Sequence, residues 1–136
     1  MRDLHNNIEI RQALAPAVGS DDTPLVSAII DCAGFDGMEF AIVTGTLADA
    51  DATWTVLIEH DDAANLATKA SVPDGSLLGT EAGASFTFAA DNVVKKIGYR
   101  GTKRYVRMTI TPDGNAGNAP IAAVAILGFP KMAPTA

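Results

Sequence analysis

The side chains that could carry out catalysis are few in this 136-residue sequence, which contains one cysteine, Cys32, and two histidines, His5 and His60. A catalytic Ser-His-Asp or Cys-His arrangement requires a base beside its nucleophile, usually in an enclosed pocket. His60 ends a predicted strand and directly precedes Asp61 and Asp62, at a position that is typically open to water. We therefore interpret His60 as a solvated turn residue and Cys32 as a small buried hydrophobe, and we predict that the chain is not an enzyme.

Two acidic pairs could supply oxygen ligands to a cation. Asp49 and Asp51 belong to one loop and Asp61 and Asp62 to another, and calcium usually takes roughly six to eight oxygens. The sequence lacks the EF-hand pattern, the CxxC and HxxxH spacings of zinc sites, and the GxGxxG and GxxxxGKS/T phosphate loops. We expect solvated turns and no cofactor, and cation binding by these loops remains an alternative.

Basic side chains gather in one stretch of an acidic chain, whose net charge is −6 from 16 acidic and 10 basic residues. This balance disfavours nucleic acid and anionic membranes as partners, and Tyr99 and Tyr105 alone would make a thin stacking platform for bases. The stretch is predicted to be a hairpin that turns at Gly101-Thr102. It is either an exposed edge protected from aggregation or a docking patch for an acidic protein surface, and its members are Lys95, Lys96, Arg100, Lys103, Arg104 and Arg107.

Alternation of apolar and polar residues supplies the elements that must position these side chains. In residues 52–60, Trp54, Val56 and Ile58 point to one face, and in residues 103–112 the inward positions are Val106, Met108 and Ile110. Turn signals separate the runs, among them Asp36-Gly37, which indicates a hairpin. The predicted strands are residues 8–14, 25–31, 38–47, 52–60, 85–90, 93–101, 103–112 and 121–129.

Two segments differ from this alternating pattern. Residues 121–129, IAAVAILGF, are apolar throughout, which is typical of a strand covered on both faces. Residues 61–70 begin with Asp61 and Asp62, either of which can cap a helix, and continue with alanines and Leu66. We predict one short helix there.

The pattern predicts an all-β fold, an antiparallel β-sandwich of jelly-roll type with about eight strands. At 48% apolar residues the chain has the composition of a single globular domain. We divide it into an N-terminal arm (1–22), a sandwich domain (23–130) and a C-terminal tail (131–136). Ile8 and Ile10 in the first arm, and Phe129 and Met132 at the other end, could lie across a neighbouring subunit or pack on their own domain.

Neither secretion nor membrane insertion is predicted. The N-terminal segment MRDLHNNIEI has no apolar core of a signal peptide, and no run approaches the roughly 18 apolar residues of a membrane helix. We expect a soluble protein that is made in the cytoplasm.

Three stretches carry a resemblance to a known family: LVSAIIDCAGFDGMEFAIVTGTLADADATWTVLIEHDD, LLGTEAGASFTFA and KKIGYRGTKRYVRMTITP. They resemble small structural proteins encoded among the head genes of tailed bacteriophages and of prophages in proteobacteria, from about Arg2 to Pro134. The resemblance implies a virion protein without catalytic residues, namely a capsid decoration (cement) protein. Its partners would be the major capsid protein and neighbouring copies of itself, on the capsid surface.

Two other functions remain open. A tail, neck or head-completion protein of the virion would have the same composition as a decoration protein. A carbohydrate-binding β-sandwich would need exposed aromatic rings, whereas Trp54 alternates with aliphatic residues and is predicted to be core. For the interaction with a partner we expect Ile8, Ile10, Lys95, Lys96, Arg100, Lys103, Arg104, Phe129 and Met132.

Overall fold

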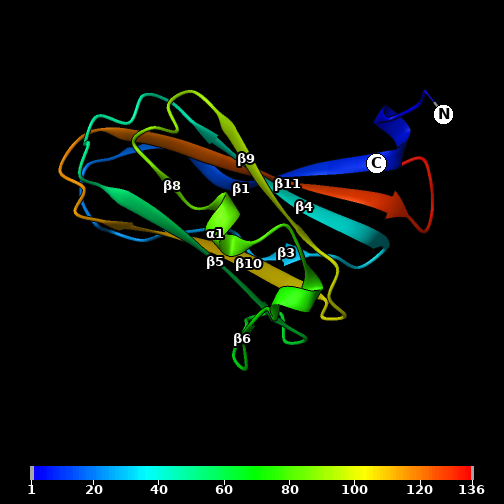
Figure 1. The fold of residues 1–136 in the computed structure, drawn as a ribbon. Coiled ribbons are helices and arrows are strands. Elements are labelled where there is room, and N and C mark those ends of the chain that lie inside the picture. The colour runs from blue at the N-terminus through cyan, green and yellow to red at the C-terminus, as the bar shows by residue number, and fades with distance from the viewer. Residues whose placement is uncertain (1, 136) are drawn as a thin grey trace.

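Two antiparallel sheets face each other in the computed structural model, which describes residues 2–135 (Figure 1). The five-stranded sheet runs in the order β1 (Ile8–Gly19), β11 (Ala119–Pro130), β4 (Phe35–Thr44), β9 (Val94–Tyr99) and β7 (Leu77–Leu78). The second sheet contains β2 (Leu25–Val26), β10 (Tyr105–Asp113), β5 (Thr53–Asp61) and β6 (Ala70–Ser71), with β3 (Ile30–Asp31) on β10 and β8 (Phe86–Thr87) on β5. Short helical turns are η1 (His5–Asn7), η2 (Asp74–Ser76) and α1 (Glu81–Ala84). The prediction of an all-β sandwich is confirmed.

The core lies between the sheets and has the predicted alternation. Trp54, which is 1% exposed, stacks on Phe86 with ring centroids 5.4 Å apart. From the opposite sheet, Phe40 and Ile42 of β4 are fully buried against this layer. The inward residues of β5 and β10 are those predicted: Trp54, Val56, Ile58, Val106, Met108 and Ile110.

The predicted helix at residues 61–70 is wrong. Asp61 ends β5, and its carboxylate accepts hydrogen bonds from the Ala63 N–H and from the N–H and hydroxyl of Thr68. An aspartate that bonds nearby backbone in this way favours a loop over a helix, and Leu66 within the loop has a positive φ of 55°. The four-residue helix is instead α1, where the Thr80 hydroxyl accepts a hydrogen bond from the Gly83 N–H.

Both predicted hairpins are also wrong. Asp36 and Gly37 lie within β4, and the chain turns earlier, at Gly34, where φ is +89°. The turn at 101–102 does not join paired strands, because β9 belongs to the five-stranded sheet and β10 to the other. At both places the chain crosses from one sheet to the other.

Two predicted strands are shorter than expected. Residues 25–31 divide into β2 and β3, because the buried Ser27 between them uses its hydroxyl to accept a hydrogen bond from the Met108 N–H. Within residues 85–90, only Phe86 and Thr87 pair with a neighbouring strand.

The terminal segments pack on their own domain. Strand β1 pairs with β11 from Ile8↔Gly128 to Gly19↔Ala119, so residues 8–19 belong to the sandwich. Thr135 donates hydrogen bonds to the backbone oxygens of Asn6 and Ile8, which brings the described ends together (Figure 1). The structure therefore favours the second of the two alternatives for these arms.

The edge strand β1 is irregular along its length. Its pairing with β11 shifts between Gln12 and Leu14 and again between Leu14 and Ala17, near Pro16. On its other side, the Ala13 carbonyl accepts a hydrogen bond from the Ala28 N–H, and Arg11 donates to the Asp31 carbonyl. These bonds tie β1 to the segment that leads into the second sheet.

Strand β11 is buried on one face. Ala123, Ala125 and Leu127 point into the core and are at most 1% exposed, whereas Val124 and Ile126 point outward and are half-buried. The prediction that both faces of this strand are covered is therefore wrong for the isolated chain. Among residues 2–135, no helix is long and apolar enough to cross a membrane.

Candidate interaction surface

The two side chains first considered for catalysis have structural contacts. His60 Nδ1 lies 2.9 Å from the Tyr99 hydroxyl, and burial lowers the pKa of His60 below its usual value. Cys32 is half-buried, and burial raises the pKa of its thiol to about 11. At neutral pH the cysteine is protonated, and the histidine contacts a phenol.

The acidic loops use their carboxylates to hold backbone. Asp49 accepts hydrogen bonds from the N–H groups of Asp51 and Ala116, so it joins two loops. Asp61 organises the loop up to Thr68, as described above, and Asp62 pairs with Lys103 at 2.9 Å. Within the described part of the chain, no three His, Cys, Asp or Glu side chains are grouped so that they could hold a metal ion.

The basic residues do not form one patch. Arg104 makes two hydrogen bonds of 2.8 and 2.9 Å with the Asp31 carboxylate, Lys103 pairs with Asp62, and Arg107 pairs with Glu59 at 3.0 Å. Lys95 and Lys96 are neighbours on β9, so their side chains leave opposite faces of the sheet. Three of the six basic side chains of this stretch are therefore paired with carboxylates of the same chain.

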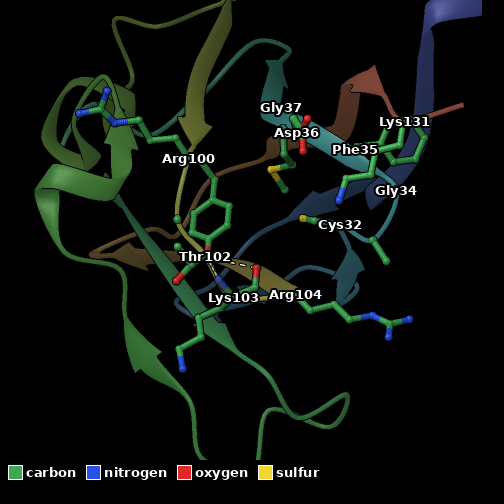
Figure 2. Close-up of a pocket in the computed structure, with 14 residues that line it drawn as sticks. Cys32, Gly34, Phe35, Asp36, Gly37, Arg100, Thr102, Lys103, Arg104 and Lys131 are labelled. Atoms are coloured by element: carbon green, nitrogen blue, oxygen red, sulfur yellow. Dashed lines mark hydrogen bonds between the residues drawn. The ribbon is translucent and has the colours of Figure 1, made fainter.

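A pocket of about 370 Å³ lies at one end of the sandwich, and Arg100, Lys103 and Arg104 are among the residues that line it. Figure 2 shows that Arg100 and Arg104 extend from its rim toward opposite sides, while the Cys32 side chain lies on its wall. The Arg100 Nε donates to the Gly75 carbonyl at 3.1 Å. Because the guanidinium groups diverge, the pocket does not gather them around a common anion.

The outer faces of the two sheets differ in character. On β5 and β10, outward positions carry Thr53 and Thr55, the Glu59–Arg107 ion pair, and Thr111. On the five-stranded sheet the outward positions are mainly apolar. We call this second surface the open sheet face, and its apolar members are Ile10, Val18, Ala41, Val43, Leu78, Val94, Ala122, Val124, Ile126 and Phe129.

The register shows how the open sheet face is built. One row across the strands contains Ile10, Ile126, Glu39, Gly98 and Leu78, and Ile10 is 58% exposed. The next outward row contains Gln12, Val124, Ala41 and Lys96, and the row after that contains Ala122, Val43 and Val94. Only Gln12, Glu39 and Lys96 are polar in these rows. Contiguous exposed apolar surface of this kind marks interaction sites.

Phe129 extends the face at one end. Its φ of 51° and its 79% exposure set it apart from the rest of β11. Its ring lies over Gly37, where a Cβ atom would be 2.7 Å from Cδ2, so a side chain at this position would displace the ring. Leu4, Ile8 and Pro130 line an apolar hollow on one side of the ring, and Leu78 and Ile126 contribute to another.

The structure therefore brings some of the predicted partner-binding residues together. Ile8, Ile10, Lys96 and Phe129 lie on or beside the open sheet face, whereas Lys103 and Arg104 lie at the end of the sandwich in ion pairs. Met132 is 86% exposed beyond β11. Five further members of this face were not predicted from the sequence, although the uniformly apolar run at 121–129 was a signal for two of them: Val43, Leu78, Val94, Val124 and Ile126.

Comparisons with known proteins show what this fold resembles. No protein-family model and no curated protein matches the chain. Among solved structures, the PBSX exported protein XepA superposes with a TM-score of 0.58 at 15% identity, over 97% of this chain and 40% of that one. The SPBc2 prophage-derived protein YomS gives a TM-score of 0.50 at 11% identity, over 88% and 93%. The chain thus spans less than half the length of XepA and most of that of YomS, and what they share is the fold.

Proposed function

We propose that this chain is a structural protein of a bacteriophage particle, a decoration protein that binds the major capsid protein lattice and stabilises the head. The observation that carries the proposal is the open sheet face. An apolar sheet surface of this extent is stabilised when another protein covers it, because burial removes apolar area from water. The second sheet, with its threonines and ion pairs, is suited to solvent.

Two further findings support a role in a phage. The chain resembles small phage head proteins in the stretches quoted above, and it shares its fold with XepA and with the prophage-derived YomS. On a symmetric lattice many modest contacts add by avidity, so no single contact must be strong. The cementing effect would come from bridging coat subunits that would otherwise separate on heating.

The proposal can be tested on particles assembled with and without this protein. We expect heads that lack it to release DNA at a lower temperature, and complete heads to contain it in a number comparable with the coat subunits. Heads of equal heat resistance would refute the cementing role. A content limited to a single ring of subunits would show instead a neck or tail protein.

Matched variants connect attachment to the open sheet face. Val43 is 45% exposed in the middle of this face, and Thr111 is an exposed outward residue of β10 on the other sheet. We expect Val43→Asp to remove the protein from purified heads and Thr111→Asp to leave it bound. Equal occupancy of the two variants would show that attachment does not depend on this face.

The tryptophan and tyrosine rings give little support to a carbohydrate-binding role. Trp54 and Tyr99 are 1% and 5% exposed, so neither ring is available to stack on a sugar. Tyr105 is half-buried beneath the Arg104 guanidinium, 5.1 Å from the ring centroid.

A further inference from the structure

We infer that the open sheet face packs against the same face of a second copy of this chain, so that Glu39 of each copy meets Lys96 of the other. This inference deepens the proposed function, on which it rests for its biological setting, by naming the partner at that face. The open sheet face would then support attachment indirectly: the two-chain unit meets the capsid with its remaining surfaces and with twice the contacts of a single chain, so a chain that cannot pair is also lost from heads.

Two opposite charges in the middle of the apolar face select this partner. Glu39 on β4 and Lys96 on β9 lie in adjacent outward rows, and among the described residues neither forms an ion pair or side-chain hydrogen bond. The Glu39 carboxylate lies directly over Gly98 of β9: a Cβ atom at Gly98 would be 2.6 Å from Glu39 Oε2. Burial raises the pKa of Glu39, and Lys96 offsets part of that shift.

A partner without matching charges would bury Glu39 and Lys96 with only the attraction between these two groups of one chain, which form no direct ion pair, as compensation, and this is costly. A second copy avoids this cost. In an isologous contact, residue i meets residue j and j meets i. A two-fold axis that lies in the interface and passes between Glu39 and Lys96 therefore forms the pair twice.

The same axis also matches the apolar residues. On a flat grid drawn from the strand register, with strands about 4.8 Å apart and a rise of about 3.4 Å per residue, it passes close to Val124. It then sets Ile10 and Ile126 of one copy opposite Val43 and Val94 of the other. The strands of the two copies then cross at about 70°, which is nearer to the orthogonal than to the aligned geometry of packed sheets.

The area of the face is near the lower end of the range found for stable pairs. At the spacings given above, the face covers about 600 Å² per copy, before the protruding Phe129 ring is added. A standard stable interface buries roughly 800 Å² per partner. The outward side of β11, whose sequence is typical of a strand covered on both faces, would then be covered by the second chain.

A charge exchange tests the inference on the purified protein. By sedimentation and light scattering, the wild type is expected at twice the chain mass of 14.1 kDa at micromolar concentration. Glu39→Lys and Lys96→Glu each place like charges in contact, so each should raise the dissociation constant at least tenfold. The double variant restores the pairing and should return to a dimer, while circular dichroism reports whether each variant is folded.

Val43→Asp should be monomeric and Thr111→Asp dimeric in the same assay. A monomeric wild type at about 100 µM, an assembly other than a dimer, or single charge variants that associate like the wild type would overturn the inference. Failure of the proposed function can be distinguished from failure of the pairing. A dimer that does not attach to heads refutes the function alone, and a monomer that attaches refutes the pairing alone.

Discussion

The Tyr99 hydroxyl connects the two sheets by hydrogen bonds at one end of the sandwich, and removing it tests how much these bonds contribute to stability. Tyr99 comes from β9 and is 5% exposed. Its oxygen lies 2.9 Å from His60 Nδ1 on β5, accepts from the Lys103 N–H at 3.0 Å and lies 3.3 Å from the Lys103 carbonyl. Tyr99→Phe keeps the ring and leaves these groups without their partner.

The expected cost follows from those contacts. A buried polar group that loses its partner costs about 1–3 kcal/mol. Because Lys103 is exposed and His60 half-buried, water can replace part of the loss, and we expect the free energy of unfolding to fall by about 2 kcal/mol. With a urea slope of about 2 kcal/mol per molar, the unfolding midpoint should fall by about 1 M.

Urea unfolding can be followed by the fluorescence of Trp54, the only tryptophan, which is 1% exposed in the folded chain. Tyr105→Phe is the matched control, because Tyr105 faces outward on β10 and its hydroxyl has no hydrogen-bond partner among the described residues. The control should change stability by less than about 0.5 kcal/mol. If Tyr99→Phe and Tyr105→Phe unfold at the same urea concentration, the hydrogen bonds of the Tyr99 hydroxyl do not stabilise the contact between the sheets.

Three further predictions concern single side chains. Burial raises the pKa of Cys32 from 9.0 to about 11, which leaves roughly 100-fold less thiolate at pH 8 than the unshifted value would. Alkylation of Cys32 should therefore be slow at pH 8 and should accelerate as the pH rises to about 11. Fast labelling at pH 8 would contradict this. The hydrogen bonds from Arg104 lower the pKa of Asp31 to about 2, below its unfolded value of 3.8. The Asp31 carboxylate therefore stabilises the fold above about pH 4 and loses that effect as the pH falls toward 2, so the Tm difference between wild type and Asp31→Asn should shrink between pH 7 and pH 2.5. Trp54→Ala should lower stability by about 3–5 kcal/mol, measured by circular dichroism, and a smaller loss would show that the pocket left behind collapses.

Much of the core could be predicted from local pattern. Trp54, Val56 and Ile58 alternate with polar residues, and a strand with one buried face must alternate in this way. The same argument placed Met108 and Ile110 correctly on β10. These positions depend only on strand period and burial, which the sequence contains.

The errors arose where the outcome depends on residues far apart in the chain. Whether residues 94–99 and 105–113 pair with each other or enter different sheets is decided by their contacts with β4 and β5. The loop after Asp61 depends on its hydrogen bonds to Thr68, which compete with helix formation. The residue types within residues 61–70 do not reveal which of these hydrogen bonds form.

The open sheet face could be predicted in part. The apolar run at 121–129 indicated two covered faces, but not that one of them is left open by the isolated chain. Ile8 and Ile10 were proposed as contact residues of a separate arm, yet they reach this face as part of a paired strand. Val43, Val94 and Leu78 come from three other strands and could be grouped only after the sheet order was known.

The irregular edge of strand β1 has a consequence for how copies of the chain can accumulate. Pro16, the two shifts in register and the bond from Ala28 to Ala13 leave no uninterrupted row of free backbone groups for an incoming strand. Fibres that grow by adding strand upon strand are therefore disfavoured at this edge. In the proposed pair, association through the open sheet faces is isologous and closes on itself, so this pairing adds no route to endless polymers.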